Sequence, residues 1–204
     1  MLLVEGVAGI GKTTLINELI RRYVDSNKRI RSSLHLTQAH TYQPLAPDEI
    51  DSKLLPEQNI AHLEQILDLL TWLVSSVSYE QRKIFFCTID TFHITHCFRP
   101  GILNWNDVAT FDRRLHQLGC KLIFLRATEE TIWERTVWGR RDNEFITYYG
   151  RKYGDSLESI HNYYAQEQRK MLAIAELSAM KKLTIDCGRV NADISQEAFD
   201  FWMK

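Results

Sequence analysis

Short apolar runs and longer amphipathic runs alternate along this chain, and the alternation predicts its layers. Residues 83–90, 121–126 and 182–186 are short and mostly apolar, which is typical of strands covered on both faces. Residues 29–36 form a weaker strand pattern, and residues 57–77 form the strongest amphipathic helix pattern. Strands that alternate with helices predict an α/β fold, with a parallel sheet between two layers of helices.

The chain begins with one more strand and helix, separated by glycines. The apolar residues 1–4 precede the glycines, and apolar side chains then recur at a helical spacing over 15–24. This spacing predicts a helix that starts at or near Lys12. Later helix starts are indicated by Thr128 as an N-cap, and by Asp155 with Glu158 as a capping box.

Residues 135–156 break the pattern, because they are polar, dense in Arg and Tyr, and carry three glycines. We expect this segment to be a surface lid rather than part of the core. The 204 residues are 45% hydrophobic and 25% charged, so we expect a single domain over 1–204.

Charge and cysteine content bound the class of protein. The net charge of −1 gives no support for a nucleic acid polymer as partner. No apolar run is long enough for a membrane span, and the four cysteines form no C-x-x-C pair. We therefore expect a reduced, cytoplasmic protein that does not bind a membrane.

The glycine-rich stretch 6–13 fits the pattern G-x-x-x-x-G-K-[ST] between a strand and a helix, which is the context the motif requires. Glycines let successive backbone N–H groups point inward at a helix N-terminus, where they bind phosphate. The expected cofactors are ATP and Mg²⁺, with Lys12 on the β and γ phosphates and Thr13 on the metal. The expected cofactor-binding residues are Gly6, Val7, Ala8, Gly9, Ile10, Gly11, Lys12, Thr13 and Thr14.

Two other classes of phosphate-loop protein lack support. A GTPase would carry N/T-K-x-D, whereas "NKRI" at 27–30 ends in Ile30. An AAA-type motor would follow its metal-side aspartate with a catalytic Glu, whereas Asp90 is followed by Thr91.

Phosphoryl transfer needs a carboxylate and positive charge near the moving group. Asp90 ends a predicted strand, where it would either bind the metal side or deprotonate the acceptor. Arg135, Arg140 and Arg141 are the lid cations expected to act with Lys12 in catalysis.

The chain resembles the nucleoside and nucleoside-monophosphate kinases, especially the thymidylate kinase and deoxynucleoside kinase branch. The resemblance lies in "VEGVAGIGKTT", "TIDTFHIT", "LIFLRATEETIWERTVWGRRD" and "LTIDCGRVNADISQEAF". It implies a three-layer P-loop kinase fold, with a five-stranded parallel sheet of order 2-3-1-4-5 and an Arg-rich lid. It also implies ATP with Mg²⁺ and an acceptor pocket that faces the phosphate loop.

The acceptor stays open, because the sequence departs from that branch at the acceptor side. Thr91 stands where an arginine is expected, the loop "TQAHTYQP" lacks another, and the first acid after the second strand is Asp48. A monophosphate normally meets an arginine fork, and a neutral hydroxyl needs a base. The candidate substrate contacts are Gln38, Tyr42, Phe92 and Arg99.

Several residues keep two interpretations. His93 and His96 lack a third metal ligand at matching spacing, so they line the acceptor pocket or cap a helix. The tyrosines stack on a base or pack in the core: Tyr148, Tyr149, Tyr153, Tyr163 and Tyr164.

The sequence thus predicts ATP-dependent phosphoryl transfer to a small acceptor, a nucleoside or nucleoside monophosphate. The alternatives are a kinase of a non-nucleoside alcohol and a non-catalytic nucleotide-binding regulator. Whether the helix pattern 57–77 forms a homodimer interface stays open.

Overall fold

The computed structural model describes residues 1–26, 32–37, 55–76, 85–98, 103–140, 145–147, 149–150, 154, 156–188 and 194–204. Its centre is a parallel five-stranded sheet of order β2-β3-β1-β4-β5, as predicted. The strands are β1 (Leu2–Glu5), β2 (Ser32–Leu36), β3 (Phe85–Asp90), β4 (Lys121–Arg126) and β5 (Lys181–Asp186).

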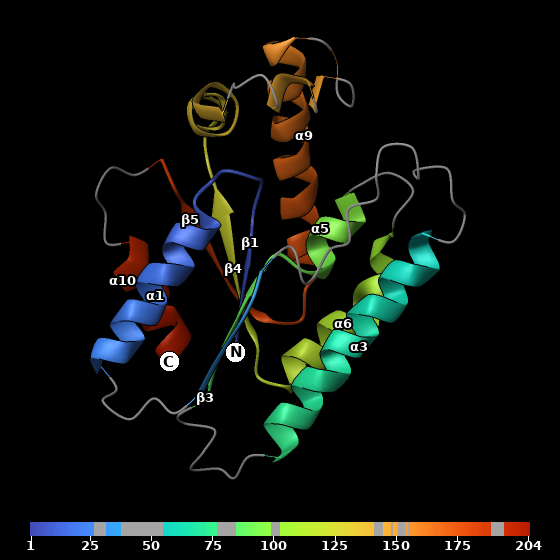
Figure 1. The fold of residues 1–204 in the computed structure, drawn as a ribbon, viewed down its shortest axis with the longest axis vertical. Helices are drawn as coiled ribbons and strands as arrows, with labels where there is room; N and C mark the ends of the chain where they lie inside the picture. The colour runs from blue at the N-terminus through green and yellow to red at the C-terminus, as the bar shows by residue number, and fades with distance from the viewer. Residues whose placement is uncertain are drawn as a thin grey trace.

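Helices cover both faces of the sheet (Figure 1). One face carries α1 (Lys12–Ser26) and α10 (Ile194–Met203). The other face carries α3 (Leu55–Ser76), α5 (His93–Phe98), α6 (Trp105–Gln117) and part of α9 (Leu157–Glu176). The three-layer fold is therefore confirmed.

Strand side chains alternate between two buried clusters, one on each face of the sheet. Leu3 and Leu122 belong to the cluster with α3, α5 and α6, whereas Val4 and Ile123 belong to the cluster with α1 and α10. This period of two explains why the strands read as continuously apolar, since both faces are covered.

Strand register brings the loop after β1 next to the end of β3. Val4 lies opposite Asp90 on β3 and opposite Ile123 on β4. The N–H of Thr91 then donates to the Val4 carbonyl at 3.0 Å. The first glycine loop and Asp90 therefore leave the sheet at the same carboxyl edge, where ligands bind in open α/β sheets.

Most predicted boundaries lie within two residues of the observed ones. The strand 121–126 coincides with β4, and the helix pattern 57–77 corresponds to α3. Of the pattern 29–36, the structure describes Ser32–Leu36, and residues 29–31 lie outside the described residues.

The two predicted helix starts had different outcomes. Thr128 caps α7 (Glu129–Ile132), because its side chain accepts from the Thr131 N–H. Ser156 is the N-cap of α9 and accepts from the Ser159 N–H, so the predicted Asp155–Glu158 capping box is wrong about the cap, and Asp155 itself lies outside the described residues. Serine caps helices as well as aspartate does, and here it lies one residue nearer the helix.

The lid segment is partly core, which corrects the expectation of a surface element. After α7 the chain continues as a π-helical turn, Trp133–Val137, and a 3₁₀ turn, Trp138–Arg140. Val137 and Phe145 are buried in the cluster around α1. Because the segment runs over the end of the sheet, its few apolar residues become part of that cluster.

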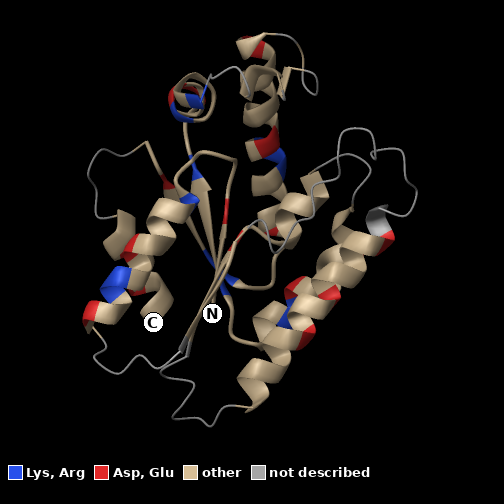
Figure 2. Cartoon of the chain, in the orientation of Figure 1, with Lys and Arg blue, Asp and Glu red and all other residues tan. Residues whose placement is uncertain are grey.

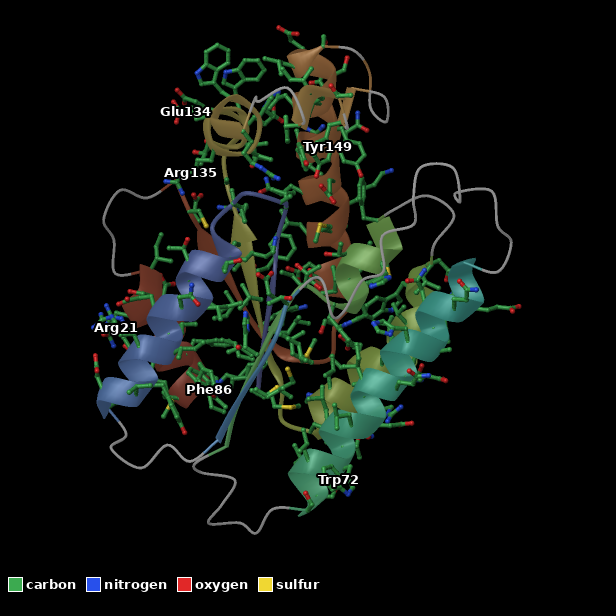
Figure 3. The ribbon with its side chains drawn as sticks, in the orientation of Figure 1. Arg21, Trp72, Phe86, Glu134, Arg135 and Tyr149 are labelled. Carbon is green, nitrogen blue, oxygen red and sulfur yellow. The ribbon has the colours of Figure 1, made fainter. Side chains whose placement is uncertain are left out.

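Charges of both signs are spread over the helices drawn in Figure 2. Within the described residues, no helix combines the length and apolarity needed to cross a bilayer. All four cysteines are free, as expected for thiols without a paired spacing. Trp72 is 64% exposed near the C-terminal end of α3 (Figure 3), and a homodimer through this helix stays a prediction.

Candidate functional site

The loop between β1 and α1 is shaped by its glycines. Gly6 has φ of +145°, and a Cβ there would lie 2.7 Å from the Leu125 carbonyl oxygen. Gly9 has φ of +77°, in the left-handed region that favours glycine. At position 6 only glycine combines a positive φ with room beside the Leu125 carbonyl, so the glycines allow a tight turn that leads into the N-terminus of α1. This turn leaves backbone N–H groups available to an anion.

Lys12 is the first residue of α1 and is buried within the loop. Its Nζ donates to the Gly6 carbonyl at 2.8 Å and to the Val7 carbonyl at 3.1 Å. Burial lowers the pKa of Lys12, while the carboxylates of Asp90 and Glu5 oppose this shift. A bound phosphate would add negative charge and favour the protonated amine in the same way.

Thr13 and Asp90 meet beside the loop, although 77 residues separate them in the sequence. The Thr13 hydroxyl donates to Asp90 Oδ2 at 2.8 Å, and the Thr91 hydroxyl donates to Asp90 Oδ1 at 3.1 Å. Mg²⁺ in phosphate sites binds one or two protein oxygens and completes its shell with phosphate and water. A hydroxyl and a carboxylate in contact fit this requirement.

A cavity of about 350 Å³ opens above these residues, which we call the loop pocket. It is lined by Ala8, Gly9, Gly11, Lys12, Thr13, Thr14, Asp90 and Arg140. Six of the nine predicted cofactor-binding residues thus line this pocket. Gly6 lines the tyrosine pocket described below, and the side chains of Val7 and Ile10 belong to the core cluster around α1.

Glu5 lies beneath the site and fixes the turn after β3. It is fully buried, and it accepts from the Phe92 N–H at 2.8 Å and from the Thr95 hydroxyl at 2.7 Å. Burial raises the pKa of Glu5, and these two hydrogen bonds oppose the shift. The turn is strained, because Thr91 has φ of +70° and is β-branched. Glu5 therefore ties β1 to the turn that presents Asp90.

The lid arginines lie on different sides of the loop. Arg140 lines the loop pocket, and its Cδ would be 3.3 Å from a Cβ on Gly9. Arg135 instead lines a second cavity of about 560 Å³, the apolar pocket, and extends from the lid helix (Figure 3). Arg141 lies outside the described residues. π-helical turns occur often at functional sites, and here Arg135 lies within one, whereas Arg140 ends the 3₁₀ turn that follows.

The apolar pocket lies on the α1 and α10 side of the loop. It is lined by Gly9, Ile10, Gly11, Thr14, Leu15, Glu18, Leu125, Arg135, Cys187, Ile194 and Ser195. Its mixture of apolar walls and a few polar groups is typical of a small-molecule site.

A third cavity, the tyrosine pocket, lies on the other side of the loop and encloses about 110 Å³. It is lined by Gly6, Ala8, Lys12, Thr91, Thr95, Arg140, Tyr149, Tyr163, Tyr164 and Glu167. Three of the tyrosines that sequence left undecided thus line a cavity. Tyr148 and Tyr153 lie outside the described residues.

Of the four predicted substrate contacts, the structure describes Phe92. Phe92 is a correction, because it is fully buried in the core cluster with α5 and lines none of the three pockets described above. Its N–H bond to Glu5 accompanies a turn that sends its ring inward. Gln38, Tyr42 and Arg99 lie outside the described residues.

The two histidines are core residues rather than pocket residues. Both are fully buried in α5, and His93 Nε2 lies 3.0 Å from Asp112 Oδ1. Within the described ranges, no three His, Cys, Asp or Glu side chains cluster as a metal site.

Comparisons with known proteins bear on the fold. No protein-family model matches the sequence, and no curated protein matches it. The YorR protein from Bacillus subtilis, in complex with phosphorylated GDP, has a similar structure, with a TM-score of 0.58 and 16% identity over 98% of this chain and 93% of that chain. The chain has a P-loop kinase fold.

A shikimate kinase from Bacteroides thetaiotaomicron is also similar, with a TM-score of 0.49 and 11% identity. The match covers 97% of this chain and 92% of that chain.

Sequence reasoning missed Glu167 and Thr95, and it gave Glu5 no role beyond the resemblance. Glu167 occupies an ordinary polar position in a helix pattern, so nothing local marks it. Thr95 and Glu5 are 90 residues apart, and only the sheet brings them together. A carboxylate at the end of an apolar strand, directly before the first glycine, was the signal that the sequence offered for Glu5.

Proposed function

We propose that this chain is an ATP-dependent phosphotransferase that acts on a small acceptor, in the class of nucleosides and nucleoside monophosphates. The observation that carries this proposal is that Lys12 and Arg140 line both the loop pocket and the tyrosine pocket. Two cations at the junction of two cavities are what an in-line transfer between donor and acceptor requires. The γ phosphoryl group would pass at that junction.

Each pocket then has one task. The backbone N–H groups of residues 6–14 would bind the β and γ phosphates, and the apolar pocket would take the donor base. Thr13 and Asp90 would hold Mg²⁺, which supplies charge neutralisation on the phosphate oxygens. Lys12 and Arg140 would neutralise the transferring group, and the tyrosine pocket would hold the acceptor. Catalysis would be mainly positioning and electrostatics.

The size of the tyrosine pocket favours a second candidate, a kinase of a compact non-nucleoside alcohol. Its volume of about 110 Å³ is below the roughly 300 Å³ at which small-molecule pockets usually begin. A nucleoside would therefore require the lid and α9 to separate on binding, whereas a compact alcohol would not.

A thermal-shift panel combined with an ADP-release assay tests the function. We expect ATP with Mg²⁺ to raise the melting temperature, and one acceptor class among nucleosides, monophosphates and small alcohols to add a further shift and release ADP. ATP with EDTA is the control for the metal. Stabilisation by ATP without turnover of any acceptor would instead identify a nucleotide-binding regulator, and no shift with ATP would refute the proposal.

A further inference from the structure

Asp90 and Glu167 line different pockets beside the phosphate loop. Asp90 lines the loop pocket, and both of its oxygens accept from threonine hydroxyls, those of Thr13 and Thr91. Glu167 lines the tyrosine pocket and is only 5% exposed. Among the described lining residues, Asp90 is absent from the tyrosine pocket and Glu167 is absent from the loop pocket. The acceptor side therefore has a carboxylate of its own.

The packing of α9 directs Glu167 into this pocket. Tyr163, Tyr164 and Glu167 all line it, and their spacing puts them on adjacent positions of one helix face. The next residue, Gln168, binds the backbone of Ala127 twice. Its Oε1 accepts from the Ala127 N–H, and its Nε2 donates to the Ala127 carbonyl, each at 2.8 Å. This double contact fixes the rotation of α9 against the end of β4.

The charges around the tyrosine pocket favour one kind of acceptor. Lys12 and Arg140 form its cationic wall, and Glu167 adds an anionic side chain on α9. A monophosphate would meet repulsion from Glu167, and it would compete with the ATP phosphates for the same two cations. Monophosphate sites normally offer a separate arginine fork, and Arg140 is the one arginine among the described residues of this lining.

A compound with hydroxyl or amino groups fits the same lining. Its O–H or N–H groups can donate to the Glu167 carboxylate, and its apolar face can rest on the rings of Tyr149 and Tyr163. Burying a carboxylate is costly unless it is paired or hydrogen-bonded, and such a ligand would add hydrogen bonds to it.

We propose that Glu167 binds the reacting hydroxyl of the acceptor and takes its proton, and that the acceptor is a neutral or cationic hydroxyl compound rather than a monophosphate. This inference rests on the proposed phosphotransferase function. In the step, the acceptor oxygen bonds to the γ phosphorus as its O–H bond breaks. The bond from that phosphorus to the bridging oxygen breaks, its electron pair leaves with ADP, and the proton goes to the Glu167 carboxylate.

The test compares acceptor kinetics of the wild type, Glu167→Gln and Glu158→Gln. Glu158 is an exposed glutamate on the same helix, which makes it a matched control for the loss of one negative charge. We expect turnover with a hydroxyl compound and none with monophosphates. Glu167→Gln should lower kcat by about 100-fold, as loss of a general base does, and leave KM for ATP within about twofold. Glu158→Gln should behave as wild type.

Chemical rescue separates a proton acceptor from a residue that only supports the wall. We expect added formate to restore part of the turnover of Glu167→Ala in proportion to its concentration, and not that of Glu167→Gln, whose amide fills the space. Thermal shift with ATP checks that each variant is folded. If Glu167→Gln is unfolded, the rescue of Glu167→Ala by formate still decides whether Glu167 accepts the proton.

Different failures identify different errors. A monophosphate acceptor, wild-type kcat in Glu167→Gln, or no rescue of a folded Glu167→Ala would overturn this inference and leave the kinase standing. A wild type that does not bind ATP, or binds it without turning over any acceptor, would overturn both proposals.

Discussion

The donor side and the acceptor side of the site are built in different ways. The lining of the proposed donor side comes mainly from one contiguous loop within residues 8–14, together with Asp90 from the neighbouring strand and Arg140. The acceptor side draws its lining from the same loop, the turn after β3, the lid and α9. In the proposed function, the first would bind through main-chain groups whose positions follow from glycines, and the second would bind through side chains from distant segments. A short motif can therefore specify a donor site, but not an acceptor.

Charge is also distributed differently. On the donor side Asp90 contacts the two neighbouring threonine hydroxyls beside a buried lysine, so the described groups there form one compact set. On the acceptor side Arg140 and Glu167 come from the lid and α9, so their relation depends on how these elements pack. Variants at one side, or at both, therefore test whether the two sides affect kcat and KM for ATP independently.

The largest effect is expected at the shared lysine. Lys12→Ala should lower kcat on the order of 10²- to 10³-fold, because it removes a charged donor to the transferring group. Its melting temperature should stay near that of the wild type, since the Lys12 amine donates to carbonyls of its own loop rather than to another element. ADP release and thermal unfolding measure the two quantities, with the exposed Lys204→Ala as control. Unchanged turnover would remove Lys12 from the mechanism.

The two lid arginines should separate the sides. Arg140→Ala should lower kcat about 10- to 100-fold, which is the value of a hydrogen bond to a charged group, because Arg140 lines both pockets on the path of transfer. Arg135→Ala should raise KM for ATP several-fold and change kcat less than about twofold, since Arg135 lines the apolar pocket. Steady-state kinetics with both substrates varied gives each constant. Equal effects of the two variants on kcat would mean that the two arginines do not have the separate roles that their different pockets predict.

The smallest effect is expected at Glu5, which lies beneath both the donor and the acceptor side. This effect is on the stability of the fold rather than on turnover. Burial raises the pKa of Glu5 above its ordinary value of 4.5, so the folded state holds this proton more tightly than the unfolded state. Its contribution to the free energy of unfolding is therefore fully present below about pH 4.5, and it is lost as pH rises through the raised pKa.

Urea unfolding at a series of pH values measures the slope of the free energy of unfolding against pH. Glu5→Gln should remove it, because the amide does not titrate and can still accept from the Phe92 N–H. Glu64→Gln, at an exposed position on α3, should leave the slope unchanged. An identical pH dependence in Glu5→Gln and the wild type would show that Glu5 does not titrate in this range.

Sequence predicted the fold because it depends on local patterns, and the donor side, which stays a proposal, was predicted from a local pattern in the same way. Strands covered on both faces are continuously apolar, and the glycine loop has a fixed spacing. The structure agrees with the fold and brings the loop, Thr13 and Asp90 together. Phe92 was misassigned because the direction of a side chain after a strand depends on the turn, here one with a positive φ at Thr91. Residues 137 and 145 joined the core because the lid packs over the sheet end.

Glu167 was invisible in the sequence for a related reason. Its direction depends on the rotation of α9, which the contacts of Gln168 with Ala127 determine across 41 residues. Helical periodicity distinguishes inner from outer faces, but it does not tell a buried face that packs from one that borders a cavity.

The pairing of Val4 with Asp90 determines how far Asp90 lies from Thr13. A shift of β3 by one residue along β1 would carry the aspartate about 3.3 Å away from Thr13 and turn it to the opposite face. The distance between the Thr13 hydroxyl and the Asp90 carboxylate is therefore set by the main-chain pairing of the two central strands, β1 and β3. Changes in the apolar side chains around it alter packing energy, but they leave this spacing unchanged as long as the alignment of the two strands is preserved.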